Sequence, residues 1–198
     1  MLHSVFKRYK SQEKQYISLI KKCIDHGVNS SDRTGVGTKS LFGEKLEFDI
    51  SKTIPVMTTR KTAFKTCMKE MLWMLRGQTD ANILKKQKCF IWDGNTTREF
   101  LDNRGLNHLP EGDIGALYSF QLRHFGAEYK TCNDDYTGQG TDQLAYVINE
   151  IKTNPTSRRI LFNYWNASDI DKGCLNPCHV LFQFNVEGDI LSGCLFQR

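Results

Sequence analysis

Residues 179–198 read HVLFQFNVEGDILSGCLFQR, and their pattern indicates two β-strands joined by a turn. Apolar and polar residues alternate on either side of EGD, residues 187–189, and such runs around a short turn containing Gly are typical of a hairpin. The segment RILFNYW, residues 159–165, indicates one more strand just upstream. The C-terminal part of the chain is therefore expected to form a mixed, mostly antiparallel sheet.

Apolar residues recur at helical spacing before this sheet, and capping residues bound the segments that carry them. Gly27 and Gly77 each follow such a segment as a C-cap, and Thr141 or Asp142 is the candidate N-cap of another. The mixture of helices and strands predicts an α+β fold in a single domain. Helices are expected over residues 12–26, 62–76, 81–90 and 141–152, a strand over 39–50, and a long polar connection over 93–116.

The composition excludes several classes of protein. The 198 residues include 27 Lys and Arg against 22 Asp and Glu, which gives a formal charge of +5, with 39% apolar and 25% charged residues. This mixture is typical of a globular domain and argues against disorder. A charge of +5 favours small anionic ligands but is too low to predict nucleic-acid binding by itself. No apolar run is long enough to cross a bilayer and no signal core is present, so we expect a soluble cytoplasmic protein.

Seven cysteines are present, which is an odd number, and no CxxC pair occurs among them. The five histidines do not cluster with the cysteines, so neither a complete disulfide framework nor a zinc site is expected. Without a signal peptide the thiols are expected to be reduced. Each cysteine taken alone is expected to be a small buried apolar residue.

One cysteine stands in a more informative context. The segment LNPCH, residues 175–179, places Cys178 between a turn proline and His179, just before a strand. A thiolate is a strong nucleophile once nearby cations or a polar site lower its pKa. Adjacent strand residues point to opposite faces, so His179 is not expected to act as a direct base for Cys178. Local sequence alone leaves a packed cysteine as the alternative.

Four arginines form a second pattern, because each lies in or next to a turn or a strand end. Arg33 lies in the Gly-rich loop DRTGVG, the pair Arg158 and Arg159 follows a turn, and Arg198 ends a strand. Guanidinium groups bind phosphate with two parallel hydrogen bonds, which makes a phosphate site one interpretation. Ordinary solvated arginines are the alternative.

Three other side chains could line a pocket. Glu70 lies on the flank of the predicted helix 62–76, beside its apolar stripe, where it could act as a general acid or base. Trp92 and Tyr118 lie in turn-rich stretches where an aromatic ring could stack on a planar ligand. A solvated glutamate and packed aromatic rings are the alternatives.

Taken together, these segments resemble the thymidylate synthase family. The match runs in chain order from about residue 13 to Arg198, and RHFGAEYK and TGQGTDQL are most similar to the eukaryotic-type branch, which includes fused reductase–synthase enzymes. The segments that carry the resemblance are DRTGVGT, PVMTTRK, KEMLWMLRGQT, IWDGN, GDIGALY, RHFGAEY, QGTDQL, NPTSRRI, WN, LNPCH and LFQR.

The resemblance implies reductive methylation of dUMP to dTMP, with 5,10-methylenetetrahydrofolate donating the one-carbon unit and a hydride. It makes Cys178 the nucleophile that adds to C6 of the pyrimidine, Glu70 the organiser of water for proton transfer, and Tyr118 a helper in removing the C5 proton. The implied substrate-binding residues are Arg33, Arg158, Arg159, His179, Gln197 and Arg198, with Asn166 in the surrounding polar network. The implied folate-binding residues are Ile91, Trp92, Asn95, Leu175 and Arg60, with Lys61 beside Arg60.

The resemblance also implies an assembly and domain boundaries. The family's phosphate site receives Arg158 and Arg159 from the other subunit of a homodimer, and a face of the sheet is expected to form that interface. No metal, membrane or nucleic acid is expected as a partner. Residues 1–12 are expected to be a flexible N-terminal segment, and residues 13–198 the synthase domain without its C-terminal third.

The chain departs from the family pattern at several places. Ala116 stands for a proline, Ser119 for a glycine and Leu122 for a tryptophan. Loss of the tryptophan and of the turn proline is expected to loosen the wall beside Tyr118. The family continues past the position of Arg198 with the asparagine that reads the pyrimidine, so residues 1–198 alone are expected to be inactive. A dCMP or dUMP hydroxymethylase, and an inactive remnant that binds anions or RNA, stay open as alternatives.

Overall fold

The computed structural model of the protein describes residues 2–32 and 35–198, and the chain divides into two compact units. The first unit ends at Phe64 and the second runs from Lys65 to Arg198. Arg33, one of the expected phosphate ligands, lies outside the described residues.

The first unit contains a long helix and a two-stranded hairpin. Helix α1 spans Leu2–His26, and Gly27 N–H donates to the Cys23 carbonyl at 2.9 Å where the helix ends, as expected of a C-cap. The helix begins ten residues earlier than the apolar spacing over 12–26 indicated, so the expected boundary at residue 12 falls inside it. The antiparallel strands are β1, Val28–Ser30, and β2, Thr38–Ser40.

The strand expected over residues 39–50 is wrong beyond Ser40. Gly43 has a φ of 78°, which breaks an extended segment at its middle. Side chains of α1 satisfy the following backbone instead: Gln15 Nε2 donates to the Glu47 carbonyl at 2.7 Å, and Gln15 Oε1 accepts from Glu47 N–H at 3.1 Å. A glutamine amide thus bonds to both backbone groups of one residue, as a neighbouring strand would.

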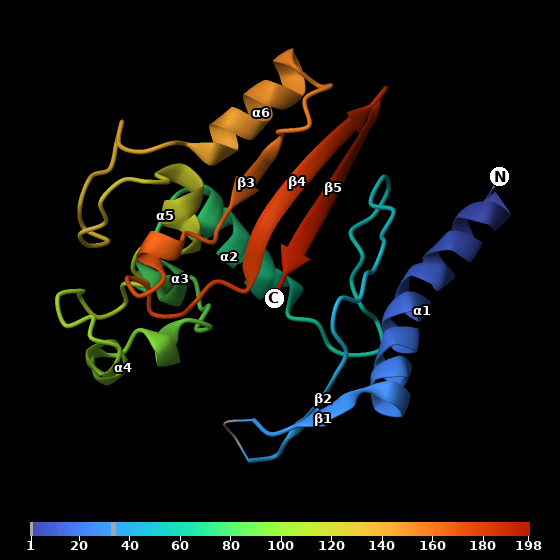
Figure 1. The fold of residues 1–198 in the computed structure, drawn as a ribbon, viewed down its shortest axis with the longest axis horizontal. Helices are drawn as coiled ribbons and strands as arrows, with labels where there is room; N and C mark the ends of the chain where they lie inside the picture. The colour runs from blue at the N-terminus through green and yellow to red at the C-terminus, as the bar shows by residue number, and fades with distance from the viewer. Residues whose placement is uncertain (1, 33–34) are drawn as a thin grey trace. The chain divides into compact units, whose positions relative to one another are not determined.

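The second unit consists of short helices and a three-stranded sheet (Figure 1). Asp142 caps α6 by accepting from Ala145 N–H, which confirms one of the two expected N-caps. Helices α2 and α3 confirm the helices expected over 62–76 and 81–90. The helical elements are α2, Phe64–Leu75; α3, Ala81–Lys86; η1, Asp93–Asn95; α4, Arg98–Asn103; α5, Tyr118–Arg123; α6, Gln143–Thr153; and η2, Ala167–Asp169.

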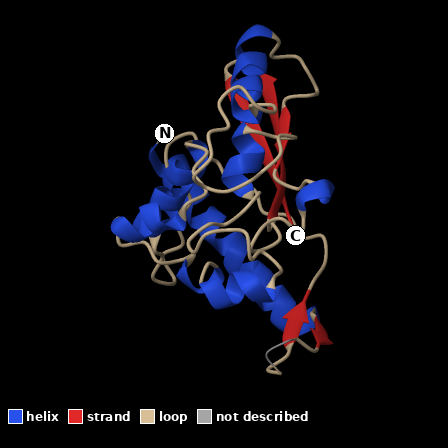
Figure 2. Cartoon of the chain, turned by 90° about the vertical axis from the view of Figure 1, so that its left-hand side faces the viewer, coloured by secondary structure: helices blue, strands red, loops and turns tan. Residues whose placement is uncertain are grey.

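The sheet has the order β3-β4-β5, and both pairings are antiparallel. Its strands are β3, Leu161–Asn163; β4, His179–Glu187; and β5, Ile190–Gln197. The two long strands β4 and β5 run side by side as the predicted hairpin (Figure 2). Helices α5 and α6 contact β3, whereas every residue of β5 is exposed. The α+β class and the mostly antiparallel sheet are confirmed.

The core takes much of its apolar volume from a segment that was expected to be a polar connection. Leu101, Leu106, Leu109 and Ile114 are all at most 3% exposed, so the expectation for residues 93–116 is wrong. Isolated apolar residues between glycines show neither a helical nor a strand period, so the sequence pattern did not predict that these residues are buried. The segment instead contains the short helix α4, which is capped by the Thr97 hydroxyl and contributes a buried residue to the core.

Two helices bury faces other than the expected ones. Trp73 is the buried residue of α2 at 1% exposure, whereas Met71 and Leu72 of the expected apolar stripe are 54% and 45% exposed. In α6 the apolar residues Val147 and Ile148 were both candidates for the buried face, and Val147 is buried whereas Ile148 is 45% exposed. Helical spacing predicted the positions of these helices in the sequence, but it predicted only some of the residues that each helix buries.

Candidate active site

Cys178 lies at the end of a loop and directly precedes β4, with its side chain exposed. Its backbone N–H donates to the hydroxyl of Tyr118 at 2.7 Å. Its carbonyl accepts from the backbone N–H of Arg198 at 3.0 Å. The thiol is therefore accessible to solvent while the backbone that carries it is held from two sides.

Arg198 lies against the loop that leads into Cys178. Its Nε donates to the Pro177 carbonyl and its Nη2 to the Asn176 carbonyl, both at 3.0 Å. Its guanidinium carbon lies 5.9 Å from the centre of the Trp165 ring, within the range of a cation–π contact. Gln197, the preceding residue, pairs with His179 across the hairpin. The β4–β5 pairing therefore brings three of the expected substrate-binding residues next to Cys178.

Tyr118 is the first residue of α5 and is only 7% exposed. Its ring makes edge-to-face contacts with Trp92 and Tyr164 at centroid distances of 6.2 and 5.2 Å, and it lies 5.7 Å from the ring of His179. Burial raises the pKa of the Tyr118 phenol, so the hydroxyl stays protonated at neutral pH. It can accept the Cys178 N–H and still has a proton to donate.

Glu70 projects from α2 and accepts a hydrogen bond from the indole N–H of Trp92 at 2.9 Å. Burial raises the pKa of the Glu70 carboxyl, and the indole donor opposes this in part by favouring the charged form. Because the same Trp92 ring touches Tyr118, Glu70 is connected through one indole to the tyrosine that bonds to Cys178. The structure thus brings all three expected catalytic side chains into one cluster.

His179 begins β4, and its ring packs against Tyr118, Tyr164 and Phe182. Burial lowers the pKa of His179, so the imidazole is neutral at pH 7. A neutral imidazole adds no positive charge beside the thiol, and the cations bonded to the loop before Cys178 are Arg198 and, at Asn176 and Gly173, Arg104.

The residues expected on the folate side are divided between the two units. Ile91 and Leu175 expose 44% and 36% of their side chains, which gives a planar ligand apolar surface to cover. Asn95 ends η1 and donates its backbone N–H to the Trp92 carbonyl at 3.0 Å. Arg60 belongs to the first unit, and its place relative to the others is not described.

Arg158 and Arg159 lie in the exposed turn between α6 and β3. The Arg158 carbonyl accepts from the side chain of Gln183 at 3.4 Å. Gln183 is five residues along β4 from Cys178, which corresponds to about 17 Å at a strand rise of about 3.3 Å per residue. Within one chain, the structure does not bring these two arginines to Cys178.

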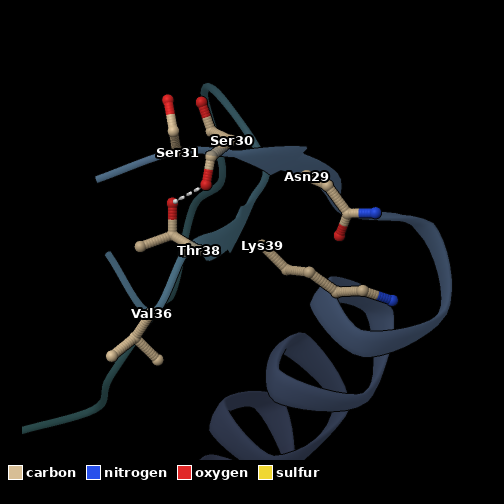
Figure 3. Close-up of a pocket in the computed structure, with 7 residues that line it drawn as sticks. Asn29, Ser30, Ser31, Val36, Thr38 and Lys39 are labelled. Carbon is tan, nitrogen blue, oxygen red and sulfur yellow. Dashed lines mark hydrogen bonds between the residues drawn. The ribbon is translucent and has the colours of Figure 1, made fainter. Parts of the chain in front are cut away.

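The hairpin β1–β2 of the first unit forms an open pocket of about 410 Å³ (Figure 3). Thr38 Oγ1 donates to the Ser30 carbonyl at 3.5 Å across it. Two of its lining residues, Val36 and Gly37, come from the Gly-rich segment between the two strands. Its lining residues are Asn29, Ser30, Ser31, Val36, Gly37, Thr38 and Lys39.

A buried amide network lies behind the site, where the family pattern led us to expect a loosened wall. Asn166 donates to Gln121 and to Asp169 at 3.2 and 3.0 Å, and Gln121 also donates to the Ala116 carbonyl at 3.0 Å. Leu122 is fully buried in the core. Ala116 donates its backbone N–H to the Lys172 carbonyl at 3.0 Å, a hydrogen bond that a proline cannot make. The substitution at 116 therefore adds a backbone contact to this wall.

The sequence patterns did not reveal Asp113, which is fully buried and bonded to Tyr129. Two of its three partners, Tyr129 and Cys132, are 16 and 19 residues away in the chain, a separation at which no local period connects them. Ser119, which stands in place of a family glycine, is fully buried, and among the described residues its hydroxyl makes no hydrogen bond.

Two further findings concern the described residues alone. No group of three or more His, Cys, Asp or Glu side chains there is placed to hold a metal ion. The helices within residues 2–32 and 35–198 are all too short or too polar to cross a lipid bilayer.

Comparison with known proteins identifies one family over nearly all of the chain. The family profile described as thymidylate synthase matches residues 14–198, across both units. A thymidylate synthase of Candida albicans is 53% identical over 88% of this chain, and one of Saccharomyces cerevisiae is 51% identical over 94% of it. A bifunctional dihydrofolate reductase-thymidylate synthase of Paramecium tetraurelia is 46% identical over 94% of it. The chain spans 56%, 65% and 40% of these relatives' own lengths, respectively.

The fold and the site together define an α+β protein in which an accessible cysteine stands between a buried tyrosine hydroxyl and an arginine. The length of the matched segment and the percentage of identical residues then assign the chain to one family. The chain belongs to the thymidylate synthase family.

Proposed function

We propose that this chain carries the nucleophile and part of the phosphate site of a thymidylate synthase, which converts dUMP to dTMP. The observation that carries the proposal is the exposed Cys178 thiol, whose backbone is fixed between the Tyr118 hydroxyl and the Arg198 amide. A nucleophile needs access to the substrate and a defined position, and Cys178 has both.

The proposed reaction begins with addition of the Cys178 thiolate to C6 of the pyrimidine. The new S–C6 bond turns C5 into an enolate-like carbanion, which attacks the one-carbon unit, and the C5 proton is then removed. 5,10-Methylenetetrahydrofolate supplies this unit and then a hydride, and it leaves as dihydrofolate. Hydride delivery is accompanied by loss of the sulfur from C6, so Cys178 is regenerated as a thiolate.

Proton transfers are proposed for Glu70 and Tyr118, two groups of the site whose pKa burial raises. Glu70, with its raised carboxyl pKa, is suited to exchange protons through water with O4 of the base. The Tyr118 hydroxyl, adjacent to the nucleophile, is suited to orient the water that accepts the C5 proton. Ile91, Trp92 and Leu175 are proposed to cover one face of the folate, with Arg60 at its anionic tail.

The nucleotide phosphate is proposed to bind Arg198, which already uses two of its N–H groups on the Asn176 and Pro177 carbonyls. Those bonds orient the guanidinium, and its remaining donors are proposed to meet the phosphate. Arg33, Gln197 and His179 are proposed to complete the contacts of this chain with dUMP.

A homodimer is proposed because Arg158 and Arg159 lie in a turn that contacts β4 at Gln183, about 17 Å along the strand from Cys178 of the same chain. They are proposed to reach the phosphate site of a second subunit. Leu191, Leu195 and Phe196 of β5 are 39–58% exposed, which offers apolar surface for such an interface. The seven free cysteines are compatible with a reducing compartment, and we propose the cytoplasm.

The proposal is tested with an extended polypeptide, in which residues 1–198 are followed by the C-terminal residues of the Saccharomyces cerevisiae relative. We expect dTMP from dUMP and 5,10-methylenetetrahydrofolate with this polypeptide, and none with residues 1–198 alone. The product mass distinguishes a thymidylate synthase from a hydroxymethylase, because a hydroxymethylase adds CH₂O to the base instead of CH₂. A folded dimer that binds dUMP and makes neither product would favour an inactive remnant.

The dimer is tested by mixing two inactive variants of the extended polypeptide, Cys178→Ser and the double variant Arg158→Ala/Arg159→Ala. If the arginines act across the interface, mixed dimers contain one intact site, and activity returns after subunit exchange. Each variant should remain inactive when exchanged with itself. Absence of recovery in dimers that have exchanged would show that the arginines do not act across subunits.

A further inference from the structure

Asp113 is a buried carboxylate for which the proposed reaction has no direct use. It is 0% exposed, and three donors surround it: its Oδ1 accepts from Gly115 N–H at 2.7 Å and from the Tyr129 hydroxyl at 2.6 Å, and its Oδ2 accepts from Cys132 N–H at 2.7 Å. Burying a carboxylate is unfavourable unless hydrogen bonds compensate for its lost hydration. Both oxygens are compensated here, so the position of Asp113 is strongly constrained.

The Gly115 amide that bonds to Asp113 lies where two backbone segments approach closely. Gly115 has a φ of 78°, and a Cβ atom built on it would lie 2.2 Å from the Lys172 carbonyl oxygen. Ala116 N–H donates to that carbonyl, and Cys174 N–H donates to the Ile114 carbonyl, both at 3.0 Å. We call this paired backbone, residues 114–116 with 172–174, the clamp.

The two segments of the clamp both continue into the candidate active site. Tyr118 follows the first segment by two residues and Cys178 follows the second by four. They meet again where Cys178 N–H donates to the Tyr118 hydroxyl at 2.7 Å. The chain therefore forms a closed loop that is bonded at the clamp and again at the nucleophile.

The backbone of Tyr118 depends in part on the preceding segment for its position, because the first turn of α5 has no side-chain cap. Helix α5 has six residues, and its N-cap, Leu117, provides no side-chain hydrogen bond. A capping side chain would normally fix the first turn of a helix. Here the clamp supplies the nearest backbone anchor upstream of Tyr118.

We infer that Asp113 is a positioning residue, which fixes Gly115 and the clamp and thereby holds the Tyr118 hydroxyl at hydrogen-bond distance from the Cys178 amide. The inference rests on the proposed function for the roles of Tyr118 and Cys178, and on geometry for the connection between them. Asp113 acts through the backbone and touches no reacting atom.

The test is amide hydrogen exchange of residues 1–198, measured by NMR in Asp113→Ala and Asp113→Asn. Asp113→Ala frees the Gly115 amide, and we expect exchange of the Cys178 amide to accelerate about tenfold or more relative to the Tyr164 amide. Tyr164 N–H donates to the Val180 carbonyl and reports general stability. The matched control is Asp135→Ala, which removes an exposed carboxylate bonded to Thr137 N–H and should leave Cys178 unchanged.

Asp113→Asn keeps one acceptor oxygen. If the alanine variant does not fold, this variant tests whether protection of the Cys178 amide depends on the bond between residue 113 and Gly115. Its oxygen can still accept from Gly115 and Tyr129, whereas its amide nitrogen cannot accept from Cys132. We expect rapid exchange at Cys132 with protection retained at both Gly115 and Cys178. In every variant the exchange rate of the Cys178 amide should change in the same direction as the exchange rate of the Gly115 amide.

The inference is overturned if the Gly115 amide is freed and the Cys178 amide stays protected, or if Cys178 and Tyr164 accelerate equally. No nucleotide or folate enters this measurement. Failure to form dTMP would therefore count against the proposed function and leave the exchange result standing.

Discussion

The backbone N–H of Cys178 and the hydroxyl of Tyr118, 60 residues apart in the chain, are joined by a hydrogen bond of 2.7 Å. The donor belongs to the proposed nucleophile, and the acceptor is a buried phenol that keeps its proton. This bond positions the backbone of Cys178 and leaves its side chain exposed.

Tyr118→Phe should remove the acceptor while keeping the ring contacts with Trp92 and Tyr164. The unpaired Cys178 N–H is expected to lower the free energy of unfolding of the second unit by about 1 kcal/mol. Urea unfolding measures this change. The control Tyr146→Phe, which removes an exposed hydroxyl 3.4 Å from the Arg159 carbonyl, should stay within about 0.5 kcal/mol of the parent. Equal losses in the two variants would contradict a specific role of the Tyr118 hydroxyl.

Trp92→Phe should raise the pKa of Glu70 further above its ordinary value. Burial already raises that pKa, and the indole N–H is the donor that opposes the shift. Removing the donor leaves the charged carboxylate less stabilised, so protonation occurs at higher pH. A carbon-13 NMR titration of the Glu70 carboxyl measures the pKa. Trp165→Phe serves as the control, and a pKa that falls in Trp92→Phe would show that the indole bond is not the governing contact.

Glu13→Gln should expose the backbone of residues 58–59 at neutral pH but have little effect in strong acid. Glu13 accepts from the Thr58 hydroxyl at 2.7 Å and from Thr59 N–H and Thr58 N–H at 2.9 and 2.6 Å, and these bonds lower its pKa from 4.5 to about 2. A carboxyl whose folded pKa is lowered stabilises the fold above its unfolded pKa, and this contribution is lost as the pH falls toward the folded value.

The measurement is exchange of the Thr58 and Thr59 amides as a function of pH, corrected for intrinsic rates. The difference between parent and Glu13→Gln should be full above about pH 5 and should disappear near pH 2. Glu44→Gln, which removes a carboxylate paired with Lys22, should leave both amides unchanged. A difference that persists at pH 2 would contradict the assignment to the Glu13 charge.

Arg198→Lys should weaken dUMP binding about tenfold to a hundredfold, measured by calorimetry with the extended polypeptide. A lysine keeps the charge, but it cannot bond to the Asn176 and Pro177 carbonyls and also present a planar pair of donors to phosphate. One charge-assisted hydrogen bond is worth about 1.5–3 kcal/mol. The control Arg76→Lys, an exposed residue after α2, should bind as the parent does. Unchanged affinity in Arg198→Lys would remove Arg198 from the phosphate site.

The elements with a regular period could be predicted from the sequence, and those held by distant contacts could not. The β4–β5 hairpin and α6 follow from alternation and from the cap Asp142. Residues 41–50 also alternate, but Gly43 breaks them and the side-chain amide of Gln15 takes the role of a neighbouring strand at Glu47. A hydrogen bond from a distant side chain produces no periodic pattern in the sequence, so it could not be predicted from one.

The same distinction holds for the candidate site. LNPCH and Arg198 are informative in the sequence because a turn, a thiol and a strand end are local features. The hydrogen bond from Cys178 to Tyr118, and the clamp that precedes it, join segments about 60 residues apart. Asp113 lies in a stretch without helical or strand period, so its burial could be found only from the structure.

The central claim is that Cys178 is the nucleophile, and the most direct test is to find the residue that carries the nucleotide. The extended polypeptide is incubated with dUMP and 5,10-methylenetetrahydrofolate, quenched with acid during turnover, and mapped by peptide mass spectrometry. We predict a nucleotide adduct on Cys178 that is absent in Cys178→Ser and retained in Cys194→Ser, the control at an exposed cysteine of β5. A nucleotide on any other residue, or dTMP formation by Cys178→Ser at the parent rate, would contradict the claim.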